Sequence, residues 1–357
     1  MALLNSFALW NNKGGVGKST ITFHLATRYA ELNPDKNVLV IDLCPQANSS
    51  MMLLGGGTIG EQNVINYCSQ ATPQTVVGYL STVITNGMRA PLPNPNNFAL
   101  HVSTLNPNLT DNLFLLCGDG NLEPISPIVS KRADDKPLTQ NPNEHPWVWI
   151  HNIFREFINN FISYSDKDVM VFIDTNPAFG VYTELAIIAA NKLICPVNAD
   201  DSSRTATNAM TILLHGTNPP HPIYGSWTFA ALAQQHNANI PEIHLTIGNR
   251  LTQYDGAASA FSALSDATAQ TLYNIYQTNP AYFTTAQRVI NNIQDFRDEY
   301  SIALRDFNTS GVVTSHLGQR LNQMTGGYYQ VFGQRVQINR ARVDECLNAI
   351  DAVIARL

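Results

Sequence analysis

The segment that most restricts the fold of this chain spans residues 13–20 and reads Lys-Gly-Gly-Val-Gly-Lys-Ser-Thr. A short apolar run at residues 6–10 precedes it, and residues 18–32 carry apolar side chains at helical spacing. Residues 37–41 follow as a nearly continuous apolar run, which is typical of a strand buried on both faces. Strand, glycine-rich loop, helix and strand in this order predict a βαβ unit, and therefore a parallel sheet with a right-handed crossover.

The glycines and the second lysine of this segment have the chemistry of a phosphate-binding loop. Gly14, Gly15 and Gly17 lack a Cβ, so that consecutive backbone N–H groups can converge on phosphate oxygens. The N-terminus of the following helix adds its dipole. The Lys18 ammonium can reach the β- and γ-phosphates of a nucleotide, and the Ser19 hydroxyl can bind Mg²⁺. The residues predicted to bind the nucleotide here are Lys13, Gly14, Gly15, Val16, Gly17, Lys18, Ser19 and Thr20.

The loop departs from the standard pattern in one place, because Asn12 stands where that pattern has its first glycine. The form K-G-G-x-G-K-[ST] resembles the deviant Walker A family, which contains ParA, MinD, the nitrogenase iron proteins and the arsenite-pump ATPases. The resemblance implies ATP as the nucleotide and an ATP-dependent homodimer. It also implies that Lys13 reaches across the dimer to the partner's nucleotide.

A carboxylate follows the second predicted strand, where Asp42 lies at the carboxyl edge of the sheet. Residues 42–48 read Asp-Leu-Cys-Pro-Gln-Ala-Asn and resemble the D-x-D-P-Q-x-N segment of ParA proteins. In that family the second aspartate positions the attacking water, and here its place is taken by Cys44. A neutral thiol is a poor substitute for that carboxylate. We expect either slow hydrolysis or compensation by another group, such as Asp174 or Asp200.

A second carboxylate, Asp174, follows the predicted strand at residues 169–173. Its position resembles that of a Walker B aspartate, and residues 174–180 resemble the D-T-x-P-x-x-G stretch of the family. The predicted catalytic residues are Lys13, Lys18 and Asp42. We expect Mg²⁺ to bind Ser19 directly, and Asp42 and Asp174 through water.

Three further groups of residues are weaker candidates. Asn249 and Arg250 follow a predicted strand, where the family uses an asparagine amide to read adenine; ordinary turn chemistry is the alternative. Asp200, Asp201 and Arg204 follow another strand and fit either a dimer interface or a solvated loop. The DNA-binding candidates near the C-terminus are Arg335, Arg340 and Arg342.

The rest of the chain predicts one doubly wound α/β domain over residues 1–357, with a mostly parallel sheet and helices on both faces. Runs rich in proline, glycine and asparagine predict surface insertions at about 55–110, 118–145 and 217–241. Helices are expected at 72–84, 147–162, 181–190, 205–214, 257–276 and 342–357. Further strands are expected at 113–117, 193–197 and 243–248.

Composition narrows the possible partners. The net charge of −6 opposes tight DNA binding unless arginines are clustered locally. Five widely spaced cysteines predict separate reduced thiols in a cytoplasmic protein, not a metal site. Acidic residues on the last helix argue against a basic amphipathic membrane anchor.

The resemblance therefore predicts a cytoplasmic, ParA-like ATPase that forms an ATP-dependent dimer and positions or partitions DNA or other cargo. Its expected partners are ATP with Mg²⁺, non-specific DNA and an adaptor protein that stimulates the ATPase. The alternative is a nucleotide-dependent switch or scaffold with little hydrolysis, acting on a protein that binds the insertions. Cys44 favours the alternative, whereas Lys13, Lys18, Asp42 and Asp174 favour the ATPase.

Overall fold

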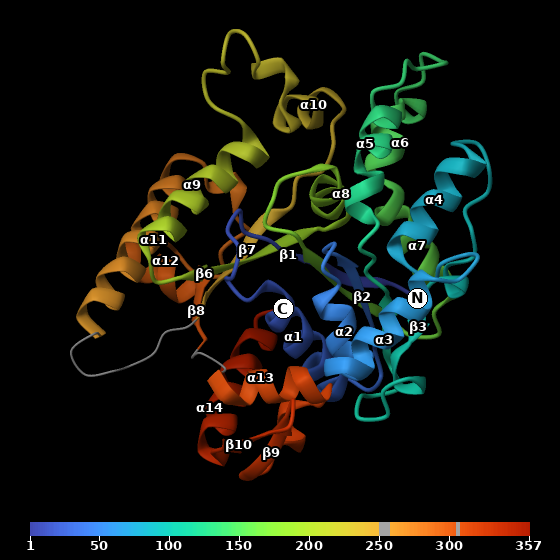
Figure 1. Cartoon of the computed structure of the whole chain (residues 1–357). Coiled ribbons are helices and arrows are strands. Elements are labelled where there is room, and N and C mark those ends of the chain that lie inside the picture. Colours follow the sequence, from blue (N-terminus) through green and yellow to red (C-terminus); the bar gives the residue numbers. More distant parts are fainter. Residues whose placement is uncertain (250–257, 305–307) are drawn as a thin grey trace.

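An eight-stranded sheet forms the centre of the computed structural model, which describes residues 1–249, 258–304 and 308–357 (Figure 1). The strand order is β3-β4-β2-β5-β1-β6-β7-β8, and every neighbouring pair except β3–β4 is parallel. The strands are β1 (Leu3–Leu9), β2 (Asn37–Leu43), β3 (Leu100–His101), β4 (Leu113–Leu116), β5 (Val169–Thr175), β6 (Lys192–Asn198), β7 (Glu242–Asn249) and β8 (Ser301–Ala303). This order confirms the predicted doubly wound, mostly parallel sheet.

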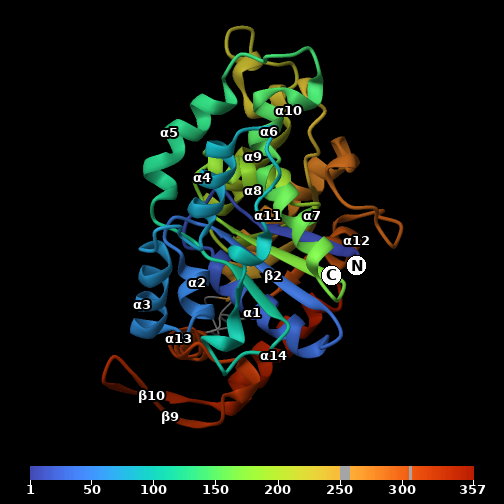
Figure 2. The same cartoon turned by 90° about the vertical axis from the view of Figure 1, so that its right-hand side faces the viewer.

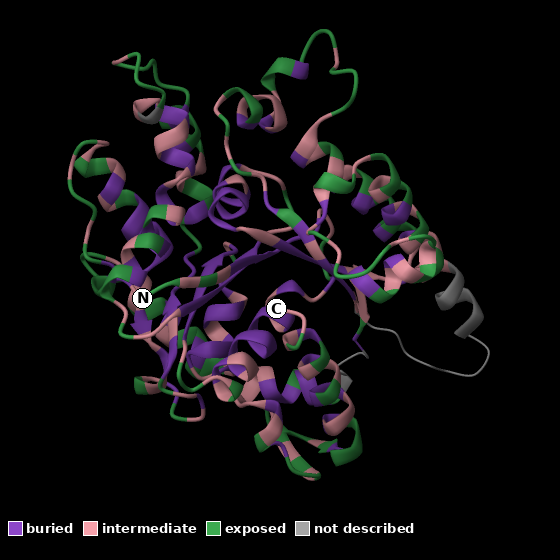
Figure 3. Cartoon of the chain, turned by 180° about the vertical axis from the view of Figure 1, so that it is seen from behind, coloured by how far each residue is buried: buried purple, intermediate pink, exposed green. Residues whose placement is uncertain are grey.

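Helices cover both faces of the sheet and enclose two apolar cores, so the central strands are buried on both sides (Figure 3). Every residue of β2 and of β5 is buried, which explains why these strands are so rich in apolar residues. One face carries α1 (Lys18–Leu32), α2 (Asn48–Leu53), α3 (Gly57–Cys68), α13 (Asn308–Leu317) and α14 (Arg340–Ile354). The other carries α4 (Val76–Asn86), α5 (Leu122–Ala133), α6 (Pro146–His151), α7 (Ile153–Tyr164), α8 (Val181–Ala189), α9 (Asp201–His215), α10 (Phe229–Gln235), α11 (Ala258–Thr278) and α12 (Ile293–Tyr300).

A separate two-stranded antiparallel hairpin precedes the last helix. It consists of β9 (Gly327–Val331) and β10 (Gln334–Ile338), and it packs beside α13 at the edge of the molecule (Figure 1). The sequence made no prediction for this hairpin or for the other elements between residues 279 and 339. Apolar and polar residues alternate along this hairpin over only a short stretch, and its polar residues are uncharged except for one arginine.

The three segments predicted to be surface insertions contain helices: α3 and α4 lie in the first, α5 in the second and α10 in the third. The glycines at residues 55–57 lead directly into α3, and α5 includes Pro127 within its span. Glycine and proline are loop signals in a sequence, but tertiary packing overrides them here. The helix predicted at 147–162 is instead two helices, α6 and α7, which meet at Asn152.

The glycine triplet has a packing reason, because the chain passes here against the end of α13. Gly56 has a φ of +69°, and a Cβ on it would lie 2.5 Å from the backbone atoms Gly318 N, Ser315 O and His316 O. Backbone atoms at that distance leave no room for a side chain. The close approach fixes α13 against α2 and α3.

We expect Gly56→Ala to lower the free energy of unfolding by about 2 to 4 kcal/mol, because it adds overpacking to a strained φ. Gly87→Ala is the matched control, since Gly87 has a φ of +86° but no atom within 4 Å of its would-be Cβ. That control is expected to lose only about 1 kcal/mol. Urea unfolding of both variants measures the difference, and equal losses would show that the close approach is not tight.

The described residues contain no helix that is both long and apolar enough to cross a membrane. The five cysteines are not joined in disulfides, and four of them are buried.

Candidate nucleotide-binding site

The glycine-rich loop follows β1 at the carboxyl edge of the sheet, and its backbone has the conformation that a phosphate-binding loop requires. Gly15 and Gly17 have φ values of +71° and +86°, which residues with a Cβ rarely adopt. Gly17 also caps the N-terminus of α1, so the free N–H groups of the first helical turn lie next to the loop. The loop can therefore present backbone donors to an anion.

Lys18 begins α1 and lies back against the loop. Its ammonium donates to the carbonyl of Lys13 at 3.0 Å and to that of Asn11 at 3.5 Å. Burial lowers its pKa to about 8, although the nearby Asp174 acts in the opposite direction. At pH 7 the side chain is therefore still mostly charged, and it is only 6% exposed. The loop holds a positive charge where a phosphate would be bound.

Asp42 and Asp174 lie side by side, because they face each other in the register of β2 and β5. Both are fully buried. Asp42 accepts hydrogen bonds from the backbone N–H and the hydroxyl of Ser50 at 2.9 and 2.7 Å. Asp174 accepts one from the Ser49 hydroxyl at 2.6 Å. Burial, and then the charge of Asp174, raise the pKa of Asp42 to about 7. Burial also raises the pKa of Asp174.

These carboxylates and the Ser19 hydroxyl fit a magnesium ion. The Ser19 side chain lies close enough to Asp174 to lower the pKa of that carboxyl, so its hydroxyl lies near the carboxylate pair. All three groups offer hard oxygen atoms, and two adjacent buried carboxylates favour a divalent cation. Within the described residues no cluster of three or more His, Cys, Asp or Glu side chains could hold a metal ion. A hydrated Mg²⁺ bound partly by nucleotide phosphates does not need such a cluster.

Cys44 lies beside these groups, in the place where the resemblance leads us to expect a carboxylate. It is only 4% exposed, and burial together with the charges of Asp42 and Asp174 raises the pKa of its thiol to about 12. The thiol is therefore neutral at physiological pH. It supplies no negative charge to orient a water molecule.

Lys13 is engaged within its own chain. Its ammonium forms an ion pair with Asp200 and lies 3.3 Å from the hydroxyl of Ser203. Asp200 caps the N-terminus of α9 by accepting from the backbone N–H of Ser203 at 2.8 Å. Burial alone would raise the pKa of Asp200, but hydrogen bonds from Lys13 and Ser203 lower it to about 2. Of the three loop residues suggested for an interface or catalysis, Asp200 is thus the one that contacts Lys13.

A cavity of about 800 Å³ opens over the glycine-rich loop. Its size is within the usual range for small-molecule sites. Its lining combines the loop with Cys44 and with residues from α2, α3, α13 and the hairpin turn. The lining residues that the sequence did not predict include Gln46, Asn48, Met51, Glu61, Val312, His316 and Phe332. No periodicity or motif indicated that α13 and the hairpin return to this site.

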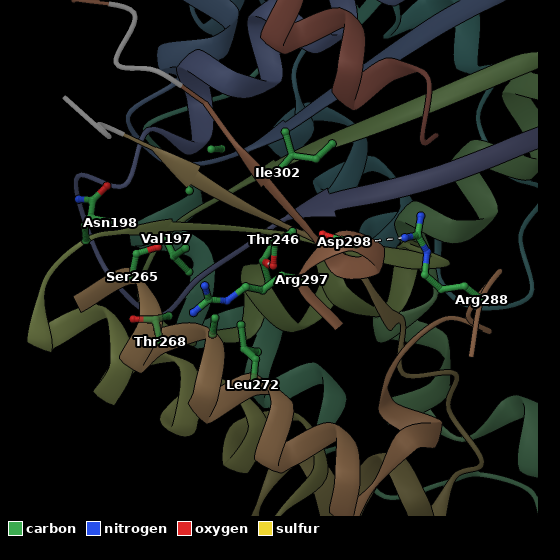
Figure 4. A pocket seen from close by; sticks show the side chains of 15 residues that line it. Val197, Asn198, Thr246, Ser265, Thr268, Leu272, Arg288, Arg297, Asp298 and Ile302 are labelled. Carbon is green, nitrogen blue, oxygen red and sulfur yellow. Dashed lines mark hydrogen bonds and ion pairs between the residues drawn. The ribbon is translucent and has the colours of Figure 1, made fainter. Parts of the chain in front are cut away.

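A second cavity, of about 540 Å³, lies between the ends of β6, β7 and β8 and the helices α11 and α12 (Figure 4). The described residues of its lining include Asn198, Thr246, Thr268 and Arg297, and none of them belongs to the glycine-rich loop. Of these two cavities, the glycine-rich loop therefore lines only the larger one.

Other predicted residues are less clearly placed at the site. Asn249 ends β7, but its side chain and the whole of Arg250 lie outside the described residues. Arg340 pairs with Asp344 and Arg342 with Glu345, so both charges are largely neutralised by their own helix. The guanidinium of Arg335 lies 3.7 Å from the centre of the Tyr328 ring.

Comparison with known protein families shows the family of the chain. The model of the CobQ/CobB/MinD/ParA nucleotide-binding domain matches residues 7–338. The chain belongs to this family. The match spans the loop, both strand-end carboxylates and α13. Membership confirms the resemblance seen in the sequence to a family of nucleotide-binding domains.

Solved structures of similar fold support the same assignment of architecture. A McdA variant from Cyanothece in complex with ATP is 14% identical, with a TM-score of 0.58, and the match covers 99% of this chain and 98% of that one. Apo McdA from Cyanothece is 14% identical, with a TM-score of 0.56 and coverage of 98% and 99%. A putative plasmid partition protein of Borrelia burgdorferi B31 bound to AMPPNP is 15% identical, with a TM-score of 0.53 and coverage of 99% for both chains. At these identities the likeness concerns the fold.

Proposed function

We propose that this member of the CobQ/CobB/MinD/ParA family is a ParA-like ATPase, acting in the cytoplasm as one domain, that dimerises with ATP and positions DNA or other cargo. The observation that carries the proposal is the cavity over the glycine-rich loop, which Lys18 and Ser19 line, with the buried pair Asp42 and Asp174 beside them. The ATP and AMPPNP complexes of proteins with the same fold support the choice of nucleotide.

Each residue of the site has a proposed role. The N–H groups of the loop and the Lys18 ammonium bind the phosphates and stabilise the charge that develops on them. Ser19 binds Mg²⁺, and Asp42 and Asp174 hold it through water; the ion would neutralise phosphate charge. Lys13 leaves Asp200 to reach the partner's nucleotide. Val16, Gly14 and Thr20 complete the loop, and Asn249 with Arg250 remains the proposed adenine-reading pair.

A second candidate function follows from Cys44. Because its thiol is neutral and buried, the water-orienting charge is missing at this position. The chain would then bind ATP and dimerise but hydrolyse slowly, acting as a switch or scaffold for a protein partner. Both functions share the ATP-dependent dimer and differ in turnover and in DNA binding.

DNA binding separates the two candidates. The ATPase proposal predicts that Mg·ATP produces a dimer in sedimentation velocity, and that this dimer binds non-specific duplex DNA more weakly as salt rises. Lys18→Ala should lose both responses. An ATP-dependent dimer with no affinity for any duplex would support the scaffold, and the absence of any nucleotide effect would contradict both.

We expect Asp200→Asn to favour the ATP-dependent dimer about two- to fivefold, because it frees Lys13 from a partly exposed ion pair. Asparagine still caps α9, so stability should change little. Asp201→Asn is the control, as it removes the neighbouring carboxylate without touching the pair. The dimer dissociation constant with ATP is measured by sedimentation. A weaker dimer in Asp200→Asn would show that Asp200 supports Lys13 in the dimer instead of restraining it in the monomer.

A further inference from the structure

The hairpin formed by β9 and β10 is a two-stranded ribbon that stands apart from the main sheet (Figure 2). Its strands pair in register from Gly327 opposite Ile338 to Val331 opposite Gln334. Phe332 and Gly333 form the turn, with φ values of +45° and +77°. Such a two-residue turn gives the ribbon the right-handed twist of regular hairpins. The ribbon is thus a regular element with two distinct faces.

The inner face of the ribbon is apolar and packs on the body of the protein. Tyr329, Val331 and Val336 contact the core beneath α13 and α14, and Ile338 is buried in it. The strands also contact α13. Because side chains alternate along a strand, the residues between these must point outward.

The outer face carries four exposed side chains that can form hydrogen bonds. Gln330 lies opposite Arg335, and Tyr328 lies opposite Gln337. Arg335 is the only charged residue between 326 and 338. Its guanidinium lies on the Tyr328 ring, which orients the planar group. Unlike Arg340 and Arg342, it forms no ion pair with any carboxylate of the described chain.

This set of side chains matches the edges of DNA bases. Arginine pairs with O6 and N7 of guanine, and glutamine with N6 and N7 of adenine. The major groove is about 12 Å wide and admits a two-stranded β-ribbon. Outward side chains on one strand are about 7 Å apart, which is close to two base-pair steps. No acidic side chain on the ribbon would repel the phosphates.

We infer that the outer face of this hairpin enters the major groove of duplex DNA and reads its sequence through Gln330, Arg335 and Gln337. The inference deepens the DNA binding in the proposed function and rests on it. With a single positive charge, the ribbon contributes selectivity more than affinity. Because of this hairpin, the dimer binds some DNA sequences more tightly than others.

The experiment is selection from a duplex library with a randomised 20-base-pair segment, using the full chain with Mg·ATP, followed by fluorescence anisotropy on selected and shuffled duplexes. We expect an enriched sequence that binds the parent protein about tenfold more tightly than its shuffled form. Gln330→Ala and Arg335→Ala should lower that ratio to near one while binding to shuffled DNA persists.

Gln334→Ala is the matched control, because Gln334 is an exposed glutamine on the same ribbon but belongs to the other face. It should leave the ratio unchanged. Binding of all duplexes without enrichment would overturn the inference and leave the proposed function standing. An ATP-dependent dimer that binds no duplex would overturn both the inference and the DNA part of the proposed function, and loss of selectivity in Gln334→Ala would overturn the assignment of faces.

Discussion

Lys18→Ala is expected to lower ATP turnover by at least about 100-fold, the usual cost of removing a charge that stabilises the reacting phosphates. ATP binding should weaken as well, because the ammonium lies inside the loop and not on the surface. Phosphate release and equilibrium titration with a fluorescent ATP analogue measure the two effects. The reason is local: Lys18 is the only cation among the described lining residues of the 800 Å³ cavity.

The fold should survive this change. Burial already lowers the pKa of Lys18 to about 8, so the charged form is disfavoured there, and removing it should not reduce the free energy of unfolding greatly. Lys131→Ala, at an exposed position on α5, is the control and should keep full turnover. Turnover within a factor of two of the parent in Lys18→Ala would contradict the assignment of the phosphate site.

Cys44→Asp is expected to raise ATP turnover about 10- to 100-fold, because a carboxylate replaces a neutral thiol at the position that orients water. The new carboxylate would lie close to Asp42 and Asp174, so its pKa should be raised by burial and by their charges. Only the ionised carboxylate can orient the attacking water. The increase in ATP turnover over the parent should therefore grow as pH rises through and above neutrality and shrink as pH falls.

Cys44→Ser separates charge from size, since it keeps the volume but adds no carboxylate. It should hydrolyse ATP no faster than the parent. Initial rates at several pH values, with saturating Mg·ATP, test both variants. If Cys44→Asp is no faster than the parent at any pH, the slow-hydrolysis reading of this residue is wrong, and another group already orients the water.

The parts of the site that were predictable are those fixed by residue type and strand order. The glycine-rich loop requires glycines and a lysine at set positions, and α1 covers the predicted residues 18–32. Asp42 and Asp174 come from segments far apart in sequence. They could still be expected to meet, because parallel strands end at the same edge of the sheet.

Other features depend on contacts that leave no local pattern. The pairing of Lys13 with Asp200 joins residues that are 187 positions apart, and nothing near either one selects that partner. α5 contains Pro127, and α3 follows three glycines, so propensity pointed away from helix in both places. The return of α13 to the nucleotide cavity is decided by close backbone packing at Gly56, which only the folded chain reveals.

The most direct test of the account is to measure ATP turnover and molecular mass on the same samples of the parent and Lys18→Ala, with Mg·ATP, with and without duplex DNA. The account predicts that the parent becomes a dimer with ATP and turns ATP over slowly, faster with DNA, and that Lys18→Ala does neither. A parent protein that stays monomeric, or that binds no ATP, would contradict the central claim that this cavity is the ATP site of a cycling dimer.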